Sequence, residues 1–417
     1  MNNFDSQKYL PRWLAPRLRM MAEEARITVL TGARQVGKST MLAHELGAEW
    51  TYFTLDDFDV QSQAKRDPDV LLAASKRIIL DEAHMIPSLF PRIKHFVDQD
   101  RTRRFILSGS ANLLLLSRTT ESLAGRAEFL HLFPLSAGEL ACSRAPKTLE
   151  QAFSQDFMPS GRPFAPMDSH ILAEMVWKGG MPEMVHRNNR PGIARWREGY
   201  IRSYLERDLR QLSQIDNLPD FKRLMSLAAL RCGCLLNQSD LARDAGLSQP
   251  TAHRYLGILD VSEQCHRLPP FHTNASKSVV KTPKLMWTDT GIAAFAAGFM
   301  SESSLLSARE WGSFLECYVF NQLRAVCGMW DPPGEIFFWR TRSGMEVDFV
   351  IRRGRRLVAI EVKAAKQVRF EDTAGLQEFM RTHSDCCMGI VLYAGGEERR
   401  MANNLMAVPL SKFIPGK

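Results

Sequence analysis

Short apolar runs that fit β-strands alternate with helical patterns between Arg26 and about Leu135. The runs are "RITVLTG", "TYFTL", "RIILDEA", "RRFILSGS" and "AEFLHLFPL". Strands that alternate with helices in this way are typical of a parallel sheet with helices on its faces. We therefore predict an α/β fold for this part of the chain.

The pattern changes three times further along the chain. A stretch with several Pro and Gly residues interrupts it at 143–169, and helical patterns then continue to about Gln214. Residues 218–290 read as a small helical unit that ends in short strands, and mixed helices and strands return from about residue 305. These changes predict four parts, at 1–145, 146–215, 216–290 and 291–417.

Residues 32–39, with the sequence "GARQVGKS", fit the phosphate-loop pattern G-x-x-x-x-G-K-[ST]. They follow an apolar strand and precede a helical pattern, which is the context that this loop requires. The glycines let the backbone curl, so that its N–H groups point at phosphate oxygens. Lys38 would reach the β- and γ-phosphates of ATP, and Ser39 would hold Mg²⁺. The alternative is a glycine-rich turn before a helix. The predicted nucleotide-binding residues are Gly32, Gln35, Val36, Gly37, Lys38, Ser39 and Thr40.

Two later strands end in polar residues that suit ATP hydrolysis. "RIILDEAH" ends in Asp81, which would position Mg²⁺, and Glu82, which would orient the attacking water. "RRFILSGSANLL" ends in small polar residues, among which we choose Ser110 as a γ-phosphate sensor and Asn112 as the second choice. All of these could instead cap the helices that follow.

The sequence resembles the AAA+ ATPases, and more narrowly a prokaryotic AAA+ family that carries a C-terminal domain of unknown function 4143. The motifs that carry the resemblance are "LTGARQVGKST", "IILDEAH", "LSGSANLL", "SLAGRAEFLHLFPLSAGEL", "KGGMPE" and "YLERDLRQL". It implies an AAA+ core at 1–145 and a helical lid or linker at 146–215. It also implies an arginine that stabilises transition-state charge. We favour Arg126 over Arg207, although either could pair with a surface carboxylate. An arginine from a neighbouring subunit would make the protein a homo-oligomer.

The helical unit has helix-turn-helix spacing. Ser239 is expected to cap one helix, Gly246 to form a tight turn and Ser248 to cap the next helix, while "KTPKLMWTDTG" suits a wing. We predict a winged helix-turn-helix at 216–290. Its second helix would present four side chains to DNA, namely Gln249, Thr251, His253 and Arg254. No basic run flanks this unit beyond Lys277, Lys281 and Lys284, which weakens the case for DNA. The alternative is a spacer or a protein contact.

The last part of the chain places charged residues inside two predicted strands, "EVDFVIRR" and "RRLVAIEVK". Residues two apart in a strand share a face, so Glu361 and Lys363 point together, and Asp348 can meet them from the paired strand. Asp348 and Glu361 would be Mg²⁺ ligands, and Glu316 on the preceding helix would complete the set. Lys363 would act on the attacking water or stabilise the charge that develops on the phosphate. The alternative is a structural salt-bridge cluster.

This constellation resembles the PD-(D/E)xK nuclease fold, so a restriction-endonuclease-like α/β domain is expected at 291–417. Val347 stands where that motif normally has Pro. The resemblance implies metal-dependent cleavage of DNA, and the basic stretches "WRTR" and "RRGRR", with Lys366, suit a phosphate backbone.

Composition adds little to this picture. The chain has 417 residues and a formal charge of +8, which is weak support for DNA as a partner. Its eight cysteines form no CxxC pair, which disfavours a zinc site. No signal segment or apolar run of membrane-spanning length occurs, so we expect a cytoplasmic protein with no membrane contact, and transporters and secreted enzymes are excluded. The predicted function is ATP hydrolysis coupled to DNA binding and DNA cleavage. The alternative is a regulatory nucleotide switch whose C-terminal domain only binds DNA or a protein.

Overall fold

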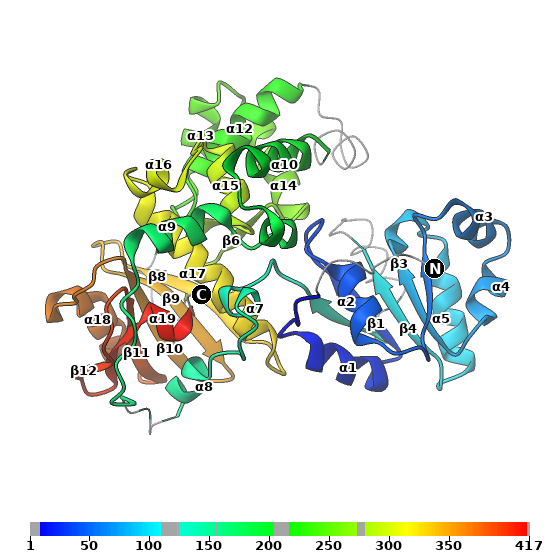
Figure 1. Cartoon of the computed structure of the whole chain (residues 1–417), viewed down its shortest axis with the longest axis horizontal. Coiled ribbons are helices and arrows are strands. Elements are labelled where there is room, and N and C mark those ends of the chain that lie inside the picture. The colour runs from blue at the N-terminus through cyan, green and yellow to red at the C-terminus, as the bar shows by residue number, and fades with distance from the viewer. Residues whose placement is uncertain are drawn as a thin grey trace. The chain divides into compact units, whose positions relative to one another are not determined.

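The computed structural model forms two compact units. The first comprises Met1–Pro134 and Val261–Glu263, and the second comprises Leu135–Asp260 and Gln264–Lys417 (Figure 1). The structure describes residues 9–109, 123, 125–154, 157, 159–203, 217–272 and 280–414. Five residues named above lie outside these ranges, namely Ser110, Asn112, Arg207, Gln214 and Lys277.

The first unit is built on a five-stranded parallel sheet with the order β2-β3-β4-β1-β5. The strands are β1 (Ile27–Thr31), β2 (Thr51–Thr54), β3 (Arg77–Asp81), β4 (Arg104–Ser108) and β5 (Ala127–His131). The helices are α1 (Ala15–Glu24), α2 (Lys38–Glu45), α3 (Phe58–Arg66), α4 (Pro68–Ala73), α5 (Leu89–Gln99) and the 3-10 turn η1 (Ala83–Met85). Every predicted apolar run forms a strand, so the prediction of a parallel α/β sheet is confirmed.

The core of this unit explains why the middle strands are continuously apolar. Ile78 and Leu80 of β3 and Phe105 of β4 are almost fully buried against Leu89 and Ile93 of α5. Burying such a side chain stabilises the fold by roughly 1.5–3 kcal/mol. Since both faces of a parallel sheet are covered, its strands carry few polar residues before their ends. The polar residues at the ends of β3 and β4 are therefore the ones available for chemistry.

The second unit begins with a helical part. Its helices are α7 (Ala137–Leu140), α8 (Thr148–Ala152), α9 (Ser169–Lys178), η2 (Pro182–His186), α10 (Arg190–Ser203), α12 (Leu218–Leu230), α13 (Gln238–Asp244), α14 (Gln249–Val261), α15 (Thr290–Ala296) and α16 (Glu302–Leu306). The strands β6 (Cys265–Leu268) and β7 (Lys284–Trp287) form an antiparallel pair. α12 to α14 followed by this pair match the predicted order of helices and short strands.

One predicted helix cap is wrong and another is confirmed. The cap of α13 is Asn237, whose side-chain oxygen accepts hydrogen bonds from the backbone N–H groups of Ser239 and Asp240 at 3.1 and 3.2 Å. Ser239 therefore lies inside the helix, because the asparagine two residues earlier already satisfies the free N–H groups of the first turn. Ser248 caps α14 as predicted, since its hydroxyl accepts a hydrogen bond from the N–H of Thr251.

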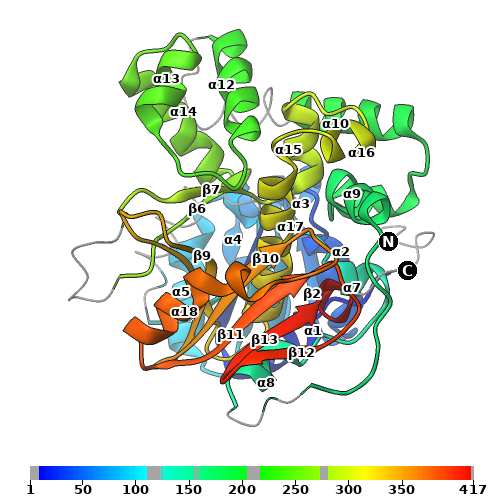
Figure 2. The same cartoon turned by 90° about the vertical axis from the view of Figure 1, so that its left-hand side faces the viewer.

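The C-terminal part of the second unit holds a mixed six-stranded sheet with the order β12-β13-β11-β10-β9-β8. Figure 2 shows β10, β11, β13 and β12 side by side. β8, β9 and β10 are antiparallel neighbours, whereas β10 and β11 are parallel. The elements are α17 (Trp311–Gly328), β8 (Glu335–Arg340), β9 (Glu346–Arg353), β10 (Arg356–Lys363), η4 (Phe370–Thr373), α18 (Ala374–Thr382), β11 (Cys386–Tyr393), β12 (Arg399–Ala402), β13 (Leu405–Pro409) and α19 (Leu410–Phe413).

The two long helices of this part cover opposite faces of the sheet. Phe349 of β9 stacks on Phe320 of α17, with ring centroids 6.0 Å apart. The next residue, Val350, belongs to the core cluster that includes Leu376 and Phe379 of α18. Successive residues of a strand point to opposite faces, so α17 and α18 lie on different sides of the sheet.

A search of the described helices for one with the length and apolar character of a membrane span finds none.

Candidate functional site

The phosphate loop lies at the carboxyl end of β1, between this strand and α2. Gly32 begins the loop at φ +149, and a Cβ atom there would lie 2.3 Å from the carbonyl oxygen of Leu132. Gly37 has φ +96 and lies at the N-cap of α2. The two glycines of the motif are therefore required by the backbone path itself, because other residues would clash or be strained there.

Lys38 is buried, with 6% of its surface exposed, although it carries a charge. Its ammonium group donates hydrogen bonds to the carbonyl oxygens of Gly32 and Ala33, at 2.9 and 3.0 Å. Burial lowers the pKa of Lys38, and attraction from Glu82 and Asp81 works against this effect. The loop thus folds around a cation, which suits a site for an anionic ligand.

Asp81 ends β3 and lies beside the phosphate loop, because β3, β4 and β1 are neighbours and parallel strands end at the same edge. Its carboxylate is 3% exposed, and its Oδ2 accepts a hydrogen bond of 2.6 Å from the Tyr52 hydroxyl. Among the described residues, Asp81 Oδ1 has no hydrogen-bond partner. Burial and then repulsion by Asp81 raise the pKa of Tyr52, while a hydrogen bond with Ser39 lowers it. Ser39, Tyr52 and Asp81 are therefore brought together.

Glu82 has a left-handed backbone, with φ +53 and ψ +39. Its Oε2 lies 3.1 Å from Nδ1 of His84. Left-handed conformations are uncommon for residues other than glycine and concentrate at functional sites. The turn therefore ends the path of β3 at the glutamate, whose charge, like that of Asp81, acts on Lys38.

Sequence reasoning missed two polar residues at this edge. Tyr52 lies in the edge strand β2, where it reads as one aromatic residue in an apolar run. Ser108 ends β4, the strand between β3 and β1, and its hydroxyl is buried with no hydrogen-bond partner in the described part of the chain. The polar end of the "RRFILSGS" run was the available signal for Ser108. The sensor predicted there, Ser110, lies outside the described residues.

Arg126 is paired with a carboxylate in the structure. Its guanidinium group donates to both oxygens of Asp98, at 2.6 and 2.9 Å. Hydrogen bonding from Arg126 lowers the pKa of Asp98. This is the surface pairing that the sequence left open, and a role as the transition-state arginine stays a prediction.

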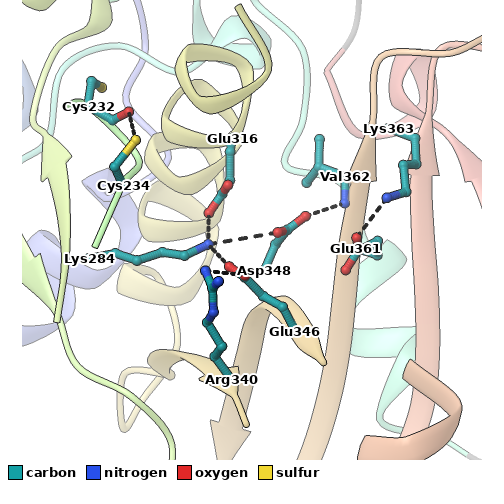
Figure 3. Close-up of polar contacts among 10 residues, drawn as sticks. All are labelled: Cys232, Cys234, Lys284, Glu316, Arg340, Glu346, Asp348, Glu361, Val362 and Lys363. Carbon is teal, nitrogen blue, oxygen red and sulfur yellow. Dashed lines mark hydrogen bonds and ion pairs between the residues drawn. The ribbon is translucent and has the colours of Figure 1, made fainter. Parts of the chain in front are cut away.

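The second unit gathers three carboxylates around one lysine (Figure 3). Lys284 Nζ lies 2.5 Å from Glu316 Oε1 of α17, 2.6 Å from Glu346 Oε1 and 3.8 Å from Asp348 Oδ1, both of β9. Lys284 is only 2% exposed. Lys284, one of the three basic residues that flank the helical unit in the sequence, is therefore not available to DNA in this structure. The local sequence gives no sign of this burial, because the carboxylates come from distant segments.

Asp348 and the β10 residues Glu361 and Lys363 lie together, as the strand pattern predicted. Asp348 Oδ2 accepts a hydrogen bond of 2.8 Å from the N–H of Val362, and Lys363 Nζ donates to Glu361 Oε1 at 2.9 Å. Burial and then repulsion by Asp348 raise the pKa of Glu361 to about 8. Burial also raises the pKa values of Asp348 and Glu316.

The same contacts test whether Mg²⁺ fits the predicted ligands Glu316, Asp348 and Glu361. In the ranges that the structure describes, no three Asp, Glu, His or Cys side chains are arranged to hold a metal ion. The ammonium group of Lys284 lies between Glu316 and Asp348, while the N–H of Val362 uses the other oxygen of Asp348. The cluster therefore fits a bound ammonium group and does not fit Mg²⁺ while Lys284 remains there.

The helix predicted to face DNA is α14, and three of its four predicted DNA-facing side chains are exposed to solvent. Gln249, His253 and Arg254 of α14 are exposed, whereas Thr251 is half-buried and its hydroxyl lies 2.9 Å from that of Ser248.

Two basic residues of the six-stranded sheet are paired with carboxylates, which partly neutralises their charge. Arg340 pairs with Glu346 at 2.9 Å, and Arg352 binds both oxygens of Glu335.

Three stretches of the chain match models of protein families. Residues 24–141 match the model of an AAA domain, residues 311–413 match that of a domain of unknown function (DUF4143), and residues 169–303 match that of another domain of unknown function (DUF8612). The protein thus has an N-terminal P-loop ATPase-like domain and a separate mixed sheet at the C-terminal end. The predicted combination of an AAA domain with DUF4143 is confirmed.

Similar proteins have been found in mycobacteria and in an archaeon. Two uncharacterized proteins, one of Mycobacterium bovis and one of Mycobacterium tuberculosis, are each 28% identical over 408 residues, which is 96% of this chain and 83% of theirs. The solved structure of a Walker-type ATPase of Pyrococcus abyssi is 16% identical, with a TM-score of 0.42, over 68% of this chain and 94% of that one.

Proposed function

We propose that this protein binds Mg²⁺-ATP at the phosphate loop and hydrolyses it. One observation carries the proposal: Lys38, Ser39 and Asp81 converge at the carboxyl edge of the parallel sheet, and Asp81 keeps a buried oxygen with no hydrogen-bond partner among the described residues. A buried carboxylate oxygen without a partner is costly, and a cation or a water bound to it would remove that cost. The match to an AAA domain supports the same assignment.

Each residue has a distinct role in this proposal. Lys38 and the N–H groups of the loop hold the phosphates, and Ser39 and Asp81 hold the cation. Bound Mg²⁺ supplies neutralisation of the charge that develops on the phosphates. Glu82 orients the attacking water, and Tyr52 holds one oxygen of Asp81 so that the other remains available.

The experiment is a steady-state ATPase assay on the wild type, Lys38→Ala and the control Lys65→Ala. Lys65 is an exposed lysine of α3, so its replacement changes the net charge equally without touching the loop. We expect Lys38→Ala to lose activity by on the order of a hundredfold, since it removes a charge that acts in a water-poor site. Equal rates for Lys38→Ala and Lys65→Ala would contradict the proposal.

DNA is the proposed partner of the ATPase. The net charge of +8 and the exposed residues Gln249, His253 and Arg254 of α14 support DNA binding by a winged helix at 216–290. The same ATPase assay, repeated with plasmid DNA at low and high salt, tests this coupling. DNA should change the rate at low salt, because phosphate contacts weaken as salt rises. No change at low salt would remove DNA from the proposal and leave the ATPase assignment intact.

Metal-dependent cleavage by the C-terminal domain stays a prediction of the nuclease resemblance. The order of elements from α17 through β8, β9, β10 and α18 to β11, with Asp348 and Glu361 on paired strands, supports a restriction-endonuclease-like fold. The position of Lys284 counts against cleavage in this state. The alternative, a C-terminal domain that binds without cutting, is therefore the better supported by the geometry.

A further inference from the structure

The carboxylates of Glu316 and Glu346 are in direct contact with the ammonium group of Lys284. Glu316 Oε1 and Glu346 Oε1 lie at 2.5 and 2.6 Å from Nζ (Figure 3). These contacts are charge-assisted hydrogen bonds, which bind both oxygens to the ammonium group. The ammonium group thus takes the place that a divalent ion would need in order to bind the same oxygens.

The backbone of Lys284 is held on two sides. Lys284 pairs with Leu268 of β6, and it forms a bridge with Leu235. The neighbouring residue Pro283 accepts a hydrogen bond from the N–H of Leu236 at 2.8 Å. The side chain therefore extends from a fixed strand and lies 5.5 Å from the centre of the Phe338 ring.

The segments that flank β6 and β7 are also tied to the six-stranded sheet. The N–H of Phe271 donates to the oxygen of Phe338 at 2.6 Å, and the N–H of Val280 donates to the oxygen of Arg340 at 2.9 Å. Both acceptors belong to β8, the edge strand of that sheet. These hydrogen bonds cover the edge and keep Lys284 aligned with α17 and β9.

Two carboxylates of the cluster already have partners other than Lys284, which leaves fewer free oxygens for a divalent ion. Glu346 already pairs with Arg340 at 2.9 Å, and Asp348 accepts the N–H of Val362. A divalent ion added beside Lys284 would be repelled by the ammonium group at close range in a water-poor site, where such repulsion is strong. The lysine and a divalent ion therefore exclude each other.

We propose that Lys284 is the resident cation of this cluster, supplied by the β6–β7 strand pair, and that it keeps divalent metal ions away from Glu316 and Asp348. The cluster then serves as a buried ion-pair joint between the helical part and the six-stranded sheet. The C-terminal domain performs no metal-dependent cleavage while Lys284 is paired with these carboxylates. This inference does not depend on the ATPase assignment.

Two measurements on the intact chain test the proposal without nucleotide. Acetylation of lysines with acetic anhydride, followed by mass spectrometry, should modify the exposed Lys281 and leave Lys284 unmodified. In the second measurement, the protein is titrated with Mn²⁺ and the electron paramagnetic resonance signal reports the free ion. The single variant Asp81→Asn and the double variant that also carries Asp348→Asn should give the same binding curve. The Asp81→Asn background weakens the phosphate-loop cation site. An extra Mn²⁺ ion that depends on Asp348 would overturn the proposal.

The matched variants are Lys284→Ala and Lys281→Ala in the same background. Lys284→Ala should gain Mn²⁺ binding, with an affinity about tenfold or more above the background, and Mn²⁺ should raise its melting temperature. Lys281→Ala should show neither change. A folded Lys284→Ala that gains no Mn²⁺ binding would refute the exclusion of metal by Lys284. If Lys284→Ala does not fold, the acetylation and Asp348→Asn measurements decide the matter.

Discussion

Glu361 predicts a pH dependence of stability that can be measured directly. Its carboxyl group is mostly buried in β10, beside Asp348, and Oε2 has no hydrogen-bond partner within the described ranges. Burial and then repulsion by Asp348 raise the pKa of Glu361 from 4.5 to about 8. The folded protein therefore carries a protonated Glu361 at neutral pH, whereas the unfolded chain carries a carboxylate.

The sign of the effect follows from this difference. A carboxyl group with a raised pKa binds its proton more tightly in the folded state, so its contribution to stability is fully present below about pH 4.5. It is lost progressively as the pH rises through the folded pKa of about 8. Each pH unit in this window changes the free energy of unfolding by up to about 1.4 kcal/mol, and the whole window by about 4–5 kcal/mol.

The assay is urea unfolding of the wild type and Glu361→Gln between pH 5 and pH 8. Glutamine has nearly the shape of the protonated acid but does not titrate, so the stability of Glu361→Gln relative to the wild type should increase with pH. Glu371→Gln, at an exposed position of η4, is the control and should keep the wild-type dependence. Parallel pH curves for Glu361→Gln and the wild type would refute the reasoning.

Two further predictions concern buried polar contacts in each unit. Arg197→Met should cost about 3 kcal/mol of stability, because Arg197 is 1% exposed, donates to the carbonyl oxygens at the C-terminal end of α9 and attracts the buried carboxylate of Asp289. Arg197 lies in α10, and Arg195→Met, at an exposed position of α10, is the control. Thermal unfolding of both variants measures the loss of stability, and equal losses would contradict the prediction. Tyr52→Phe should weaken Mg²⁺-dependent binding of a fluorescent ATP analogue, because one oxygen of Asp81 loses its donor, and should leave binding in EDTA unchanged. Unchanged affinity in Mg²⁺ would argue against a positioning role for Tyr52.

The parts of the fold that the sequence predicts are those determined by local patterns. β1, β3 and β4 are continuous apolar runs because a parallel sheet is covered on both faces. Asp348 and Glu361 could be placed together because β9 and β10 are joined by a short turn, which determines the register of their pairing. The strand order β2-β3-β4-β1-β5 was not predicted from residue patterns, because it depends on which distant strands pair.

The residues that sequence reasoning missed depend on contacts between distant segments. Lys284 lies 32 residues before Glu316, and Tyr52 lies 29 residues before Asp81. Neither position has a local pattern that separates it from its neighbours: Lys284 is one of several basic residues in its segment, and Tyr52 is one aromatic in a strand. Only the packing of β7 against α17 and β9, and the pairing of β2 with β3, give these side chains their partners.

The two carboxylate sites differ in which group supplies the positive charge. At the phosphate loop, Lys38 is bonded to backbone carbonyls, and Asp81 keeps an unpaired oxygen within the described part of the chain, so positive and negative groups are both available to a ligand. Around Lys284, the ammonium group and the carboxylates already satisfy one another. Breaking a buried pair by removing one partner costs about 3–5 kcal/mol. A ligand can therefore bind at the first site without disrupting existing ion pairs, whereas at the second it must first displace a lysine. This difference is why we assign nucleotide chemistry to the first unit and a joining role to the charged cluster of the second.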